Sequence, residues 1–142
     1  MLNNRGPTII IMNWYNKVLE NYVTFTGRAR RKEYWMFILF NAIFCTIAAI
    51  LDNLFGTSFQ TTAFHTHVPM HYGWIYMLYA LFVFLPTLAV GVRRLHDIGK
   101  SGWSFLIGFI PIFGPIILLI WFCKEGNKGD NEYGSDPKTE DL

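Results

Sequence analysis

The chain has 142 residues, which is room for one domain. Apolar residues make up 52% of the sequence and charged residues only 15%, whereas an average soluble domain has about 25% charged residues. Because a small soluble core cannot bury this apolar excess, the composition excludes an ordinary soluble domain and predicts a membrane protein. The formal net charge of +2 gives no reason to expect a nucleic-acid partner.

The N-terminal part has two predicted segments. Residues 1–12 precede any regular pattern, and we expect them to be a disordered extension. Residues 13–25 place Trp14, Val18 and Tyr22 at helical spacing. They predict a short amphipathic helix, which would lie on the membrane surface or pack against the loops of the protein itself.

The first predicted span is the apolar run at about 34–51, which contains no charged residue. Its length suffices for a crossing, particularly with some tilt. The run lies too late in the chain for a signal peptide and has no clear cleavage pattern after it, so we interpret it as an uncleaved span. Residues 52–72 contain no apolar run long enough to cross and predict an external loop.

Two further spans are predicted at about 73–92 and 103–123. Pro86 lies inside the former, where a neighbouring helix or a hydroxyl group can satisfy the freed carbonyl. Pro111 and Pro115 should kink the latter. The predicted fold class is therefore all-α and integral to the membrane, with three transmembrane helices preceded by a short amphipathic surface helix.

The C-terminal tail, residues 124–142, is polar, glycine-rich and net acidic. This composition predicts a flexible segment. Three spans that start inside leave the tail outside, whereas a re-entrant third run would bring it back.

The turn between the second and third runs contains its own signals. Asp97 is spaced to pair with Arg93 or Arg94 on one more helical turn. Gly99 is a good left-handed terminator of that helix, and Ser101 is a plausible N-cap for the next one. The connection is short, so we expect spans two and three to be antiparallel neighbours.

Charge and tryptophan positions predict the orientation. Basic residues concentrate before the first span and in the 93–100 turn, which places both on the cytoplasmic side together with the N-terminus. Trp35 and Trp103 would mark the inner boundary, and Trp74 and Trp121 the outer one.

Three segments in the same order resemble a known family. They are Phe25-Thr-Gly-Arg-Ala-Arg-Arg-Lys-Glu-Tyr-Trp35, Arg93-Arg-Leu-His-Asp-Ile-Gly-Lys-Ser-Gly-Trp103 and Gly126-x-x-Gly-x-Asn-x-Tyr-Gly-x-Asp-Pro137. Together they resemble the bacterial inner-membrane family called domain of unknown function 805, the YhaH-like inner membrane proteins. The resemblance implies a small multi-pass protein of the bacterial inner (plasma) membrane, with no established reaction.

The basic turn regions form the main candidate site. One interpretation is a topology signal alone, and the other is a contact for anionic lipid head groups or a partner protein. The residues are Arg28, Arg30, Arg31, Lys32, Arg93, Arg94, His96, Asp97 and Lys100. No nucleophile with a base and an orienting group can be assigned among them, so we do not expect an enzyme.

The remaining candidates are weaker. A histidine-rich part of the external loop does not match a metal motif, and the two cysteines predict neither a disulfide framework nor a metal site. We therefore expect no metal and no cofactor. The residues in question are His65, His67, Met70, His71, Cys45 and Cys123. Polar residues at membrane depth, namely Asn41, Thr46 and Thr87, predict hydrogen bonds between helices.

The leading hypothesis is a non-enzymatic inner-membrane protein that binds anionic lipid or a partner protein at a cytoplasmic basic face. The alternative is a subunit of a transporter or export system, assembled as a homo-oligomer or with a membrane partner, because three spans alone rarely enclose a pathway.

Overall fold

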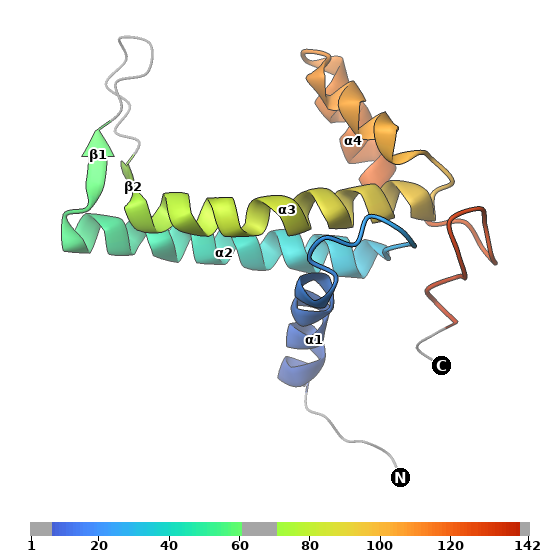
Figure 1. The fold of residues 1–142 in the computed structure, drawn as a ribbon, viewed down its shortest axis with the longest axis horizontal. Coiled ribbons are helices and arrows are strands. Elements are labelled where there is room, and N and C mark those ends of the chain that lie inside the picture. Colours follow the sequence, from blue (N-terminus) through green and yellow to red (C-terminus); the bar gives the residue numbers. More distant parts are fainter. Residues whose placement is uncertain (1–6, 61–70, 140–142) are drawn as a thin grey trace. The chain divides into compact units, whose positions relative to one another are not determined.

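A computed structural model describes the backbone of residues 7–60 and 71–139, and the side chains of residues 13–58 and 72–139. Along the chain lie α1 (Pro7–Glu20), α2 (Arg31–Phe55), β1 (Ser58–Gln60), β2 (His71–Gly73), α3 (Trp74–Asp97), the 3-10 helix η1 (Gly102–Phe109) and α4 (Phe113–Cys123) (Figure 1). The chain forms two compact units. Unit 1 contains residues 1–37 and 86–142, and unit 2 contains residues 38–85.

The first two predicted spans correspond to long apolar helices, α2 and α3. They have 25 and 24 residues, so each is about 36 Å long and exceeds the roughly 30 Å of a hydrocarbon core. Both helices extend past the predicted apolar runs at their charged ends, because Arg31–Glu33 begins α2 and Arg93–Asp97 completes α3.

The third predicted span, 103–123, is wrong as one continuous helix. The structure divides it into η1 and α4, with a break at Pro111 and Ile112. Pro111 has no N–H to continue a hydrogen-bond ladder, and Ile112 has a φ of 68°, which an isoleucine adopts only at a sharp turn. Each piece is about 16 Å long, so neither could cross a bilayer alone.

η1 and α4 form a helical hairpin, called here the η1–α4 hairpin. The two segments pack against each other, and a Cβ on Gly114 would collide with the carbonyl oxygen of Ile107. After α4 the chain returns to the end of α3, where the backbone N–H of Asn127 donates to the carbonyl of Asp97 over 2.8 Å. The ammonium group of Lys100 lies 4.5 Å from the ring of Trp121, so the prediction that Trp121 marks the opposite boundary from Trp103 is also wrong.

In unit 2, Asp52 connects the end of α2 to the start of α3. Its fully buried carboxylate accepts hydrogen bonds from the backbone N–H groups of Ile75 (3.0 Å) and Tyr76 (2.8 Å) and from the hydroxyl of Thr57 (2.6 Å). The first N–H groups of a helix have no partner within the helix, so Asp52 caps α3. A Cβ on Gly73 would collide with this carboxylate.

The loop that Asp52 closes contains β1 and β2, which pair antiparallel with Ser58 opposite Gly73. The side chains of His65, His67, Met70 and His71 lie outside the described residues, so the interpretation of these residues stays a prediction. Asn41 accepts a 2.6 Å hydrogen bond from the hydroxyl of Tyr79, which confirms the predicted bond between helices. Thr46 instead donates to Ala42 O in its own helix, at 2.8 Å, so the prediction for this residue is wrong.

In unit 1, α1 packs against the first turns of α2. Val18 and Tyr15 are buried, and the Tyr15 ring stacks on Phe37 with centroids 5.3 Å apart. The face of α1 that contains Tyr15 and Val18 therefore packs against the protein itself. The helix covers Pro7–Glu20 rather than 13–25, and the later part of the predicted disordered extension is helical.

Candidate functional site

Five buried charged residues meet where α2 begins and α3 ends, and we call them the charged cluster: Arg28, Glu33, Arg93, Arg94 and Asp97. The segment before α2 is held against α3 through its backbone. Ala29 N–H donates to Arg93 O over 3.0 Å, and His96 Nδ1 lies 3.1 Å from Gly27 O. The two basic segments, one before α2 and one at the end of α3, therefore lie side by side as predicted.

Asp97 binds two arginines at once. Its Oδ1 lies 3.1 Å from Arg28 Nε, and its Oδ2 lies 2.7 Å from Arg94 Nη1. The predicted pairing with Arg94 is thus confirmed. Arg93 instead places Nη1 2.9 Å from Glu33 Oε1, on a different helix. Because an unpaired buried charge is strongly destabilising, these pairs are required for the burial of the cluster.

Arg94 also caps the end of α4. Its Nε donates to Phe122 O over 3.3 Å and its Nη2 to Trp121 O over 3.5 Å, with a further bond to Lys124 O. The last carbonyls of a helix have no partner within the helix, and a cation suits the negative end of its dipole. This role of Arg94 could not be predicted from the sequence, because no spacing rule relates it to carbonyl groups that lie 27 to 30 positions later in the chain.

The tail, residues 124–139, is fixed on the charged cluster. Arg28 Nη1 donates to Gly129 O (2.6 Å) and Nη2 to Asn127 O (2.5 Å). Gly126 passes so close to Asp97 that a Cβ would collide with its carboxylate. This arrangement differs from the flexible tail that the composition predicts, because the guanidinium group binds backbone carbonyls, which every residue has.

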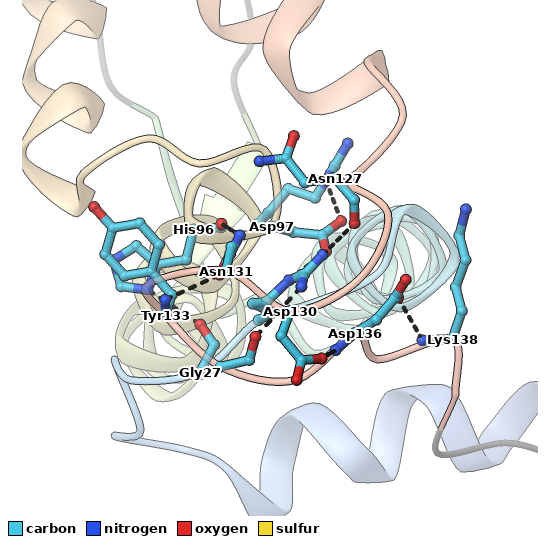
Figure 2. Close-up of polar contacts among 12 residues, drawn as sticks. Gly27, His96, Asp97, Asn127, Asp130, Asn131, Tyr133, Asp136 and Lys138 are labelled. Atoms are coloured by element: carbon cyan, nitrogen blue, oxygen red, sulfur yellow. Dashed lines mark hydrogen bonds and ion pairs between the residues drawn. The ribbon is translucent and has the colours of Figure 1, made fainter.

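The later part of the tail has its own hydrogen bonds (Figure 2). Asn131 donates to His96 O over 2.9 Å, and the Tyr133 ring stacks on His96 with centroids 4.0 Å apart. Asp136 accepts bonds from the backbone N–H groups of Lys138 and Gly129, each 3.0 Å long. These two bonds lower the pKa of Asp136 below its usual value.

The predicted basic site therefore separates into two groups. Arg28, Arg93, Arg94, His96 and Asp97 are buried and contact one another or the tail. Arg31 and Lys32 are exposed, whereas Arg30 and Lys100 are partly exposed. Arg31 lies 3.8 Å from Glu125, which also pairs with Lys138 at 2.7 Å.

A polar cavity of about 280 Å³ lies beside the charged cluster within unit 1. It is lined by Lys17, Asn21, Thr26, Gly27, Arg28, Arg93, Gly134, Ser135 and Pro137. Sequence reasoning missed it because its walls come from α1, the segment between α1 and α2, the end of α3 and the tail. The described residues contain no group of three histidine, cysteine or acidic side chains placed to hold a metal ion.

These features define the class of protein. Two long apolar helices, an apolar hairpin and a polar cluster that holds their ends are the features of a helical membrane protein. A family model described as "Protein of unknown function (DUF805)" matches residues 22–135. The chain belongs to this family, as the resemblance of its three segments indicated.

Two of the similar proteins are named as inner membrane proteins of Escherichia coli strain K12. Inner membrane protein YhaI is 46% identical over 127 residues, which cover 89% of this chain and 97% of that protein. Inner membrane protein YhaH is 46% identical over 129 residues, covering 91% and 99%. The uncharacterized protein YiiR is 28% identical over 147 residues, covering 84% and 88%. No solved structure matches the chain. The chain is thus an inner membrane protein of a family of unknown function.

Proposed function

We propose that this protein is a non-enzymatic membrane protein that binds anionic lipid head groups through exposed cations beside the charged cluster. The observation that carries the proposal is the division of the basic residues. Arg28, Arg93 and Arg94 are buried in internal pairs, whereas Arg31 and Lys32 are exposed at the start of a spanning helix. In the proposed arrangement the two cations lie at the depth of the head groups, where each contributes about 1 kcal/mol to binding an anionic surface.

The proposed orientation places unit 1 at the cytoplasmic face. α2 begins and α3 ends in this unit, and the excess of basic residues there favours the cytoplasmic side. The η1–α4 hairpin would enter the membrane from the same side and return. Its exposed apolar side chains support this, because Trp103 is 81% exposed, Phe109 83% and Ile112 75%. We therefore propose two spans and a re-entrant hairpin, the alternative to three full spans that the sequence analysis kept open.

Native mass spectrometry in a mild detergent tests the proposal. We expect the wild-type protein to retain anionic phospholipid from the membrane, and the double variant Arg31→Glu, Lys32→Glu to lose it. The matched control is Lys128→Glu, because Lys128 is an exposed cation that belongs to the tail and not to α2. Wild-type protein that retains no anionic lipid would contradict the proposal. A defined oligomer without such lipid would favour the alternative, a subunit of a transporter or export system.

A further inference from the structure

We propose that the polar cavity is a binding site for a single phosphoryl oxyanion. The side chains that would hold it are Lys17, Asn21, Thr26, Arg28, Arg93 and Ser135. They come from α1, the segment before α2, the end of α3 and the tail. The inference deepens the proposed function and rests on it where the phosphate belongs to a lipid.

Arg93 gives the strongest indication of a ligand. Its side chain is only 5% exposed, and Nη1 pairs with Glu33. No described residue accepts a hydrogen bond from its Nε or Nη2. Buried donors of a charged group are costly to leave unpaired. A phosphate oxygen in the cavity would accept from these donors, and a guanidinium group binds phosphate with matching planar geometry.

The lining of the cavity has the right charge for an anion. Three cations, Lys17, Arg28 and Arg93, line it, and no acidic side chain does. The acids that pair with the two arginines, Asp97 and Glu33, compensate part of this charge from outside the lining. Thr26 adds a hydroxyl group, and Asn21 adds an amide that donates one N–H to Lys17 O over 2.9 Å and has a second N–H, so the lining offers donors suited to the remaining phosphate oxygens.

The tail completes the cavity wall. Gly134, Ser135 and Pro137 form part of the lining, and Asp136 between them is held by the backbone of Gly129 and Lys138. Arg28, which lines the cavity, also binds the tail carbonyls of Asn127 and Gly129. The tail contacts therefore fix both a wall of the site and one of its cations.

Two sources could supply the phosphoryl group, an anionic phospholipid or free inorganic phosphate. Calorimetry with inorganic phosphate, in a non-ionic detergent without phospholipid, measures the site directly. We expect Lys17→Gln to weaken phosphate binding about tenfold, the typical effect of losing one charge-assisted hydrogen bond. Thr26→Ala should weaken it less. The matched control, Lys128→Gln, removes an exposed cation outside the lining and should leave phosphate affinity unchanged.

Nanodiscs of phosphatidylcholine containing a minority of phosphatidylglycerol distinguish the two sources. If phosphatidylglycerol competes with inorganic phosphate in the wild-type protein and not in Lys17→Gln, the ligand is the lipid phosphate. If phosphate binding depends on Lys17 but phosphatidylglycerol does not compete, the site exists and its ligand is free phosphate. This result would support the site even if the proposed lipid function failed.

Two results would overturn the inference. One is a folded wild-type protein that binds neither phosphate nor phosphatidylglycerol. The other is a Lys17→Gln variant with wild-type affinity for both phosphate and phosphatidylglycerol. The proposed function would still stand after this second result if lipid retention depended only on Arg31 and Lys32. Thermal melting of each variant shows whether it is folded. Arg93→Lys provides a second test, of the Nε and Nη2 donors of Arg93. It keeps a cation near Glu33 but removes the planar guanidinium group.

Discussion

Asp97 is the residue on which most of the charged cluster depends. It neutralises Arg28, which binds the tail, and Arg94, which caps α4. Its backbone carbonyl also accepts from Asn127. A single carboxylate thus connects the beginning of α2, the end of α3, the η1–α4 hairpin and the tail.

We expect Asp97→Asn to destabilise the protein by about 3–5 kcal/mol, because removing one partner leaves two buried arginines uncompensated. Thermal unfolding in detergent would measure this effect. Glu125→Gln is the matched control, since Glu125 also contacts two cations but its side chain is 56% exposed, where ion pairs contribute little. An Asp97→Asn variant as stable as this control would show that the cluster does not hold unit 1 together.

Asp136 provides a pH-dependent contact within the tail. Its pKa is lowered in the folded protein by the N–H groups of Lys138 and Gly129. The stabilisation is therefore fully present above the usual aspartate pKa of about 3.9 and is lost as the pH falls through the lower folded value. The protection of the Gly129 and Lys138 amides against hydrogen exchange, measured relative to their intrinsic rates, should fall over that interval.

The variant Asp136→Asn isolates this effect from other acids that titrate nearby, such as Asp130, whose carboxylate accepts from Asp136 N–H over 3.1 Å. We expect fast exchange at the Gly129 and Lys138 amides in the variant at neutral pH, because the amide side chain binds N–H groups less strongly than a carboxylate does. Unchanged protection in the variant would rule out the Asp136 carboxylate as the group that orders this segment.

At the scale of elements, Asp52 makes the start of α3 depend on the end of α2. We expect Asp52→Ala to lower the melting temperature by a few degrees, because the capped N–H groups of Ile75 and Tyr76 lose their acceptor. Asn53→Ala is the matched control, since Asn53 is exposed and its amide donates only to Ala49 O of its own helix. Equal melting temperatures for the two variants would show that the cap does not stabilise α3.

Features that are determined by neighbouring residues along the chain could be predicted from the sequence. Apolar runs predicted α2 and α3, and the structure confirms Gly99 at a φ of 70° and Ser101 as an N-cap that accepts from Trp103 N–H at 3.4 Å. These features depend on a residue and its close neighbours along the chain. The break after η1 had one local signal, because Pro111 predicted a kink there. The positive φ of Ile112 and the reversal of the chain had none, because hydropathy is the same for one long helix or two short ones.

The tail could not be predicted for a different reason. Its composition is that of a disordered segment, since it has few apolar side chains to bury. Its position depends instead on buried arginines that bind backbone carbonyls about 100 residues away in sequence, as Arg28 does with Gly129. The polar cavity was missed for a related reason, because its lining residues Lys17, Arg93 and Ser135 lie on segments far apart in the sequence.

At the scale of the whole molecule, the proposed re-entry of the η1–α4 hairpin predicts on which side of the membrane the tail lies. A single helix over 103–123 would carry the tail to the side opposite the charged cluster. In the structure the tail contacts Arg28, His96 and Asp97 directly. The bonds between the tail and Arg28, His96 and Asp97 cannot form if the tail lies across the bilayer from the charged cluster, so these bonds favour the proposed re-entrant hairpin over a third span.

We therefore expect a reporter that is active only in the cytoplasm to be active when fused to the C-terminus, and inactive when inserted between Gln60 and His71, in the loop that joins α2 to α3. A cysteine-specific probe at position 31 should label from the same side as one at position 128. A C-terminal reporter active only outside the cytoplasm would restore three spans. It would also remove the tail from Arg28 and with it the wall of the polar cavity, so this one measurement bears on the topology, the charged cluster and the phosphoryl site together.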